Sequence, residues 1–267
     1  MPTSISYNLT NGRPAGKGPA GEGMPEDTRG FVYTAIIAQA SSELAGQIHG
    51  AGGYKPFTVS RLIKPLGTGD GAGPRTLRLT ALTTKVADAF FTGLAIHLAS
   101  GQSIRIGNML LQVDQERGPV TVHSHAEYAE LADAGPADLV VLRALSPTTF
   151  TDGGRQVPLP VAATCFVSLG RKWNAFAPPD VRIPDAVEGA LRESVVVCRH
   201  DISTRAVRMR SHVEIGFVGT VGFRLMSRNG ELCKWFGALG RFAEYAGLGA
   251  HTTLGMGQTA VVQVGID

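Results

Sequence analysis

The spacing of hydrophobic and polar residues in the first half of the chain predicts a small domain of strands and helices. The clearest element is a helix over 85–99, where apolar residues recur at three- and four-residue intervals along one face. Around it the pattern predicts strands over 4–9, 56–64, 75–82 and 104–115, and two short helices over about 29–39 and 42–49. The resulting order of strand, helix, strand, strand, helix, strand is that of a ferredoxin-like domain.

The residues Ser41-Ser42-Glu43 predict a break between the two short helices. Residues 31–48 would otherwise form one amphipathic helix, but serine followed by an acidic residue is typical of a helix N-terminus. Gly50 ends the second helix. The segment 10–28, rich in glycine, proline and polar residues, is expected to be a long loop.

The second half repeats the same alternation more loosely. The pattern predicts strands over 139–144, 161–169, 195–209, 211–225 and 259–265, and helices over about 185–192 and 231–245. We therefore expect an α+β fold of two tandem ferredoxin-like (RRM-like) domains, spanning 1–117 and 138–267, with a connecting segment over 118–137.

Composition places the protein in the globular class. The 267 residues are 43% hydrophobic, and no run approaches the roughly 18–20 apolar residues of a membrane span. Residues 1–10 are too polar for an export leader, which predicts a soluble, cytoplasmic protein. The three cysteines, Cys165, Cys198 and Cys233, have no C-x-x-C spacing, so we expect reduced thiols and no structural zinc site.

The basic residues favour an acidic partner. The net charge is only +3, but 19 of the 25 basic residues are arginines, whose planar guanidinium binds phosphate with two parallel hydrogen bonds. Arg199, Arg205, Arg208 and Arg210 fall within twelve positions. We expect these four to line a path for a nucleic-acid backbone.

A glycine-rich segment over 247–257 follows the last predicted helix. It lacks the G-K-[ST] of a Walker loop, and it leaves a helix instead of opening one as a dinucleotide-binding loop does. Glycines and hydroxyl side chains let a backbone approach phosphate oxygens closely. The segment is therefore expected to be a structured phosphate-binding loop, through Gly247, Gly249, His251, Thr252, Thr253, Gly255 and Gly257.

A second candidate site is the pair His49 and Lys55, on either side of a glycine-rich turn. Histidine exchanges protons near neutral pH, and a lysine close by can stabilise an anion. A histidine at a helix end can equally be a surface or capping residue.

Three segments carry a family resemblance. "YAGLGAHTTLGMGQ" at 245–258 is similar to the glycine-rich signature of the RAMP superfamily of CRISPR-associated RNA-binding proteins. "FVYTAIIAQASSELAGQIHGAGGYKPFTVSRL" at 31–62 and "SPTTF" at 146–150 resemble the CRISPR repeat-processing endoribonucleases, the sixth Cas family. The resemblance runs from about residue 31 to the end of the chain.

The resemblance implies two ferredoxin-like domains and metal-independent cleavage of CRISPR precursor RNA within its repeats. It assigns catalytic roles to Tyr33, His49 and Lys55. It also implies CRISPR repeat RNA as the partner, with other CRISPR effector subunits as further partners, no membrane and no metal or small-molecule cofactor. A monomer or a homodimer fits it.

This assignment needs the break at Ser41. On one continuous helix Tyr33 and His49 would lie about 24 Å apart, too far to act on one phosphate. A helical hairpin brings the two ends together. The reaction expected is attack of a ribose 2′-oxygen on the adjacent phosphorus, giving a 2′,3′-cyclic phosphate and a 5′-hydroxyl, with acid and base roles shared between His49 and Tyr33 in either order.

Two alternatives stay open. A non-catalytic RNA-binding RAMP subunit of a CRISPR effector complex would keep the glycine-rich loop without needing His49 and Lys55. A ferredoxin-like regulatory or small-molecule-binding domain fits the arginine content less well. The salt dependence of RNA binding distinguishes this domain from the endoribonuclease and from the RAMP subunit, because phosphate contacts weaken steeply with salt.

Overall fold

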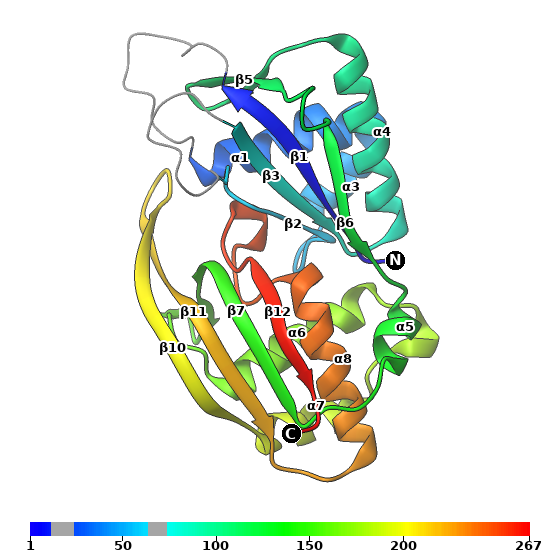
Figure 1. Cartoon of the computed structure of the whole chain (residues 1–267), viewed down its shortest axis with the longest axis vertical. Helices are drawn as coiled ribbons and strands as arrows, with labels where there is room; N and C mark the ends of the chain where they lie inside the picture. The colour runs from blue at the N-terminus through cyan, green and yellow to red at the C-terminus, as the bar shows by residue number, and fades with distance from the viewer. Residues whose placement is uncertain (12–23, 64–73) are drawn as a thin grey trace. The chain divides into compact units, whose positions relative to one another are not determined.

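The protein is described from a computed structural model covering residues 1–11, 24–63 and 74–267. The chain divides into two compact units, each a β-sheet with helices packed on it (Figure 1). The first unit comprises Met1–His125 with Met209–Ser211 and Thr253–Gly255, and the second comprises the rest of the chain from Ala126. Together they form tandem ferredoxin-like folds, as the sequence pattern predicts.

The N-terminal unit is built around a central antiparallel strand. Its elements are β1 (Thr3–Asn11), α1 (Pro25–Phe31), the π-helix η1 (Val32–Ile37), α2 (Ala38–Ala40), α3 (Ser42–Gly50), β2 (Phe57–Val59), β3 (Pro74–Ala81), α4 (Thr84–Ser100), β4 (Ile104–Ile106), β5 (Met109–Val113) and β6 (Val120–His125). The sheet order is β2-β3-β1-β5-β4, and β6 also pairs with β1.

The core of this unit lies between the sheet and its helices. Ile5, Tyr7 and Leu9 alternate along β1 and are buried, because successive side chains of a strand point to opposite faces. Helix α4 packs against β3 and against η1. The approach to η1 is so close that a Cβ at Gly93 would lie 2.0 Å from the carbonyl oxygen of Ile36, so only glycine fits there.

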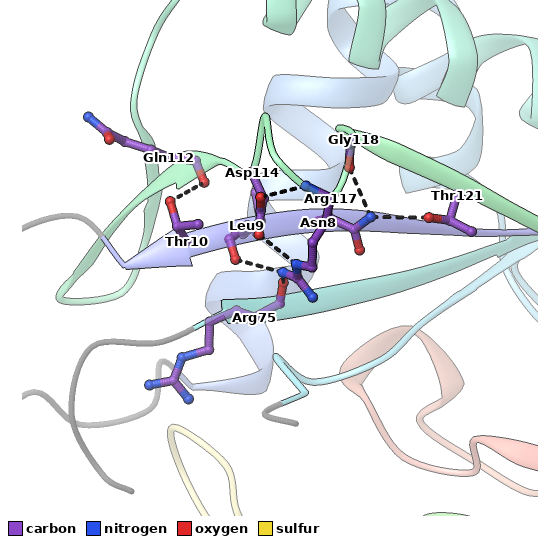
Figure 2. Close-up of polar contacts among 9 residues, drawn as sticks. All are labelled: Asn8, Leu9, Thr10, Arg75, Gln112, Asp114, Arg117, Gly118 and Thr121. Carbon is purple, nitrogen blue, oxygen red and sulfur yellow. Dashed lines mark hydrogen bonds and ion pairs between the residues drawn. The ribbon is translucent and has the colours of Figure 1, made fainter. Parts of the chain in front are cut away.

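A polar network fixes the turn between β5 and β6 against β1 (Figure 2). The Arg117 guanidinium donates to Asp114 Oδ2 at 2.5 Å and to the carbonyl oxygens of Leu9 at 3.2 Å and Arg75 at 3.1 Å. Asn8 donates to the carbonyl oxygen of Gly118 at 2.9 Å. The hydrogen bonds that the Arg117 backbone and side chain donate hold the pKa of Asp114 below its ordinary value.

The C-terminal unit repeats the topology with longer strands. Its elements are α5 (Tyr128–Asp133), β7 (Leu139–Thr148), β8 (Phe150–Asp152), β9 (Arg155–Val157), α6 (Ala162–Phe176), the 3₁₀ turn η2 (Pro179–Val181), α7 (Asp185–Ser194), β10 (Val195–Arg208), β11 (Val213–Leu225), α8 (Gly230–Ala246), the 3₁₀ turn η3 (Thr252–Leu254) and β12 (Thr259–Gly265). The main sheet is antiparallel, in the order β10-β11-β7-β12.

Aromatic rings fill the space between this sheet and helices α6 and α8, which Figure 1 places on one face of it. Phe166 of α6 stacks on Phe236 of α8, with 4.6 Å between ring centroids, and meets Phe223 of β11 edge to face. Trp173 and Phe242 extend the contact between the two helices. This packing fixes α8, and with it the start of the glycine-rich segment.

Most of the predicted elements are confirmed. Strand β12 spans the predicted residues, and α4, α7, α8, β10 and β11 match to within two residues at each end. The predicted strand 4–9 lies within β1, 75–82 overlaps β3, and 139–144 is the first part of β7. The break at Ser41 is present: its backbone is extended, and its Oγ accepts a hydrogen bond from the N–H of Leu44 at 3.2 Å.

Some predictions were wrong. The expected strand at 161–169 is the start of helix α6, because a short apolar run fits a buried helix as well as a strand and periodicity does not separate them. The expected strand at 104–115 is the hairpin of β4 and β5, turned at Gly107, whose φ is +58°. The helix after the first loop starts at Pro25, inside the expected loop 10–28.

Two further expectations concern connections. Of the predicted strand 56–64, only Phe57–Val59 is strand, and residue 64 lies outside the described residues, as do 12–23 of the expected loop. The expected connecting segment 118–137 contains β6, which pairs with β1, and helix α5.

Candidate active site and nucleic-acid interface

Tyr33 lies in the π-helical segment η1, between α1 and α2. Single π-helical turns occur often at functional sites because they re-aim one side chain within a helix. The Tyr33 ring is half-buried and packs edge to face on Phe57, with 5.4 Å between centroids. Burial raises the pKa of Tyr33, with Arg29 opposing the shift, so the hydroxyl is protonated at neutral pH and is not a base.

His49 lies in the last turn of α3 and is exposed. Its ring meets the Tyr33 ring edge to face, with centroids 5.7 Å apart and planes at 90°. The change of direction at Ser41 makes this possible, because the two residues would be far apart on a single straight helix. The structure therefore brings together the first two residues of the predicted site.

Lys55 lies beside the same helix end. Its Nζ donates to the carbonyl oxygens of Ile48 at 2.7 Å and His49 at 3.3 Å, and to that of Ala51. These carbonyls are unpaired at the C-terminus of an α-helix, where a cation is also favoured by the helix dipole. Lys55 thus caps α3 and stays close to His49, with its three N–H groups directed at the backbone.

The two rings line an open hollow on the N-terminal unit, together with Arg29 and Arg105. Neither arginine was among the predicted site residues. Arg29 could have been found from its spacing, since it precedes Tyr33 by four residues and therefore shares its helix face. Arg105 comes from β4, and nothing in the sequence relates it to Tyr33.

The glycine-rich segment is a tightly folded loop. Gly247, Gly249, Gly255 and Gly257 all have positive φ, between +63° and +79°, and all are buried. A Cβ at Gly249 would lie 2.1 Å from the carbonyl oxygen of Thr149, so this position admits only glycine. The glycines shape the loop, and its half-buried surface is formed by residues 250–254.

His251, Thr252 and Thr253 are the predicted contact residues within that surface. His251 has a φ of +59°, which is uncommon for any residue with a side chain. Its Nε2 lies 3.3 Å from Oε1 of Glu214, and the Nε2 of His212 approaches the same oxygen at 2.8 Å. Glu214 is only 4% exposed and was not predicted; it anchors His251 to the start of β11.

The four predicted arginines are all exposed but do not share one face. Arg199, Arg205 and Arg208 lie on β10, and Arg210 lies in the turn before β11. Because side chains alternate along a strand, Arg199 and Arg205 point to one face of the sheet and Arg208 points to the other. Arg210 pairs with Asp27 of α1 at 2.7 Å and lines the same hollow as Tyr33 and His49.

Part of the chain matches a known protein family. The family model of the CRISPR-associated endoribonuclease Cas6 matches residues 142–259, which include the glycine-rich loop. Over that range the chain is similar to this family. A sequence comparison with curated proteins gives no significant match.

Solved structures resemble this chain over nearly its whole length. A Thermus thermophilus Cas6, solved as a product complex, superposes with a TM-score of 0.82 at 24% identity, covering 98% of this chain and 100% of that chain. A second Cas6 product complex gives a TM-score of 0.77 at 28% identity, with 98% and 99% covered. The same Cas6 with a substrate mimic gives 0.68 at 28% identity, with 97% and 98% covered.

Two kinds of feature are absent from the described residues of the chain. In this part of the chain, no three His, Cys, Asp or Glu side chains are grouped so that they could hold a metal ion. None of its helices combines the length and apolar character that a membrane-spanning segment needs.

Proposed function

We propose that this chain is a metal-independent endoribonuclease that cleaves CRISPR precursor RNA within its repeats to produce guide RNAs. The observation that carries the proposal is the edge-to-face contact of Tyr33 and His49, with Lys55 at the same helix end. The matching family model, described as an endoribonuclease, supports the reaction class. The similar structures that hold a product or a substrate mimic support RNA as the ligand.

In the proposed reaction the ribose 2′-oxygen bonds to the adjacent phosphorus while the bond from phosphorus to the 5′-oxygen breaks. His49 takes the proton of the 2′-hydroxyl, and Tyr33 gives its proton to the leaving 5′-oxygen. Burial raises the pKa of Tyr33, so its hydroxyl is protonated at neutral pH and is unsuited to be the base, which leaves it the donor role. The products are a 2′,3′-cyclic phosphate and a 5′-hydroxyl.

Positive charge is required where the phosphorane develops negative charge. Lys55 is the proposed source, and it can turn an N–H group to the phosphate only by releasing one of the carbonyls of Ile48, His49 or Ala51. Arg29 and Arg105 line the same hollow and can bind a flanking phosphate. These three side chains supply cationic groups without a metal ion.

RNA binding is also proposed for the glycine-rich loop and for the exposed arginines near it in the sequence. The half-buried His251, Thr252 and Thr253 would contact phosphate oxygens from a loop whose shape the glycines fix. The exposed arginines of β10, together with Arg210, would follow the RNA backbone. Such contacts set the register of the RNA and weaken steeply with salt.

The test is cleavage of a CRISPR repeat RNA from the same source in the presence of EDTA. We expect one cut, with a 2′,3′-cyclic phosphate on the 5′ fragment, lost in His49→Ala while RNA binding persists. His125→Ala, an exposed histidine on β6 of the same unit, is the matched control and should cleave normally. Tight binding without cleavage by the wild-type protein would instead identify a non-catalytic RAMP subunit.

A further inference from the structure

Lys172 is a buried lysine at the base of the glycine-rich loop. It lies on α6 and is 4% exposed, although lysine is almost never fully buried without a partner. Its Nζ donates to the carbonyl oxygens of Ala246 at 3.2 Å, Gly247 at 3.2 Å and Gly249 at 3.1 Å. An ammonium has three N–H groups, so its hydrogen-bonding capacity is matched by these three carbonyls.

The position is costly for a charged group. Burial lowers the pKa of Lys172 to about 7, because the ammonium gives up its hydration. Its three acceptors are neutral carbonyls, so they do not cancel its charge. A methionine would fill similar space without this cost, but it could not bond the carbonyls. The cost of burying the ammonium is therefore justified only if the fixed positions of these three carbonyls contribute to function.

Those carbonyls belong to the end of α8 and the first residues of the loop. The last carbonyls of an α-helix have no partner within the helix, and a cation is favoured there. On the other side of the same peptides, the N–H of Leu248 donates to the carbonyl oxygen of Gly257 at 2.8 Å, and that of Ala250 donates to Thr149 at 2.8 Å. The backbone from 246 to 250 is thus held from both sides immediately before His251.

We propose that Lys172 is a positioning residue for RNA binding, which fixes the first half of the glycine-rich loop so that His251, Thr252 and Thr253 meet phosphate oxygens in one arrangement. The inference rests on the proposed function, because it assumes that this loop binds the RNA substrate. It predicts that removing Lys172 weakens RNA binding and leaves the chemical step, on the N-terminal unit, unchanged once RNA is bound.

The experiment compares Lys172→Met with Lys234→Met. Lys234 is a partly exposed lysine of α8 in the same unit, and its ammonium pairs with Asp133 at 2.7 Å, so each variant replaces one lysine by a neutral side chain of similar length. For each variant the dissociation constant for repeat RNA and the single-turnover cleavage rate at saturating RNA are measured. Hydrogen exchange at the amides of Leu248 and Ala250 reports the order of the loop.

We expect Lys172→Met to raise the dissociation constant at least tenfold and to speed exchange at both amides, with the saturated cleavage rate within threefold of wild type. Lys234→Met should change affinity less than threefold. A folded Lys172→Met protein that binds RNA as well as Lys234→Met would overturn the inference while leaving the proposed function intact. Failure of the wild-type protein to bind repeat RNA would overturn both.

If Lys172→Met does not fold, Lys172→Gln takes its place, because the amide keeps two of the three donors. It should give an intermediate loss of affinity, two- to tenfold. Wild-type affinity in a folded Lys172→Gln protein, together with unchanged exchange at Leu248 and Ala250, would equally overturn the inference.

Discussion

The rings of Tyr33 and His49 meet at a right angle, with 5.7 Å between their centroids. They come from two helices that are separated by a single extended residue, Ser41. The contact brings a hydroxyl that burial keeps protonated close to an imidazole that is exposed to solvent. The pairing of the proposed acid and base thus depends on one helix break.

The hydroxyl of Tyr33 is predicted to matter for chemistry more than for stability. Tyr33→Phe keeps the ring contacts with Phe57 and His49, so the free energy of unfolding should change by less than about 1 kcal/mol. Single-turnover cleavage at saturating RNA should slow about 10²–10⁴-fold, the usual contribution of a proton donor. Tyr54→Phe, at an exposed tyrosine of the same unit, is the control. Equal rates for Tyr33→Phe and wild type would remove Tyr33 from the mechanism.

Lys55 is predicted to have both a structural and a catalytic role. Lys55→Met leaves the carbonyls of Ile48, His49 and Ala51 without their cation, and should lower the free energy of unfolding by about 1–3 kcal/mol in denaturant titrations. Cleavage by the folded fraction should fall by at least tenfold if Lys55 also stabilises the phosphorane. Lys85→Met is the control for loss of one exposed charge. A stability loss with an unchanged rate would limit Lys55 to the role of a helix cap.

The glycine-rich loop is predicted to tolerate no side chain at Gly249. Gly249→Ala places a Cβ 2.1 Å from the carbonyl oxygen of Thr149 at a φ of +75°, which should cost more than about 2 kcal/mol of stability. Gly189→Ala in α7 meets no atom within 4 Å and should stabilise the protein by about 0.5–1 kcal/mol. Thermal or denaturant unfolding of both variants measures the difference. Similar stability of the two would show that the loop readily moves away from Thr149.

The network around Arg117 is predicted to contribute to stability in a pH-dependent way. Because hydrogen bonds from Arg117 lower the pKa of Asp114 in the folded state, their contribution is present above the ordinary aspartate pKa of about 4 and is lost as the pH falls through the folded-state value. The difference in unfolding free energy between wild type and Asp114→Asn should therefore be largest above about pH 5 and shrink below pH 4. Asp180→Asn, at an exposed position, is the control for replacing one carboxylate.

The sequence by itself determined the repeated alternation of strands and helices, since amphipathic periodicity and capping residues act over a few neighbouring positions. The helix at 84–100, the break at Ser41 and the last strand all follow from such local signals. The helix at 162–176 did not, because its buried apolar residues satisfy a strand pattern over short stretches and only their packing against Phe223 and Phe236 decides the conformation.

Only the tertiary structure decided how the candidate site is completed. The family resemblance paired Tyr33 with His49, and the local break at Ser41 made that pairing geometrically possible. Arg105, Glu214 and Lys172 are distant in sequence from the residues they serve, and nothing local marks them. In the sequence, a lysine or glutamate that folding will bury cannot be distinguished from one that stays on the surface. It gains its role only when folding removes water and leaves the group a few specific partners.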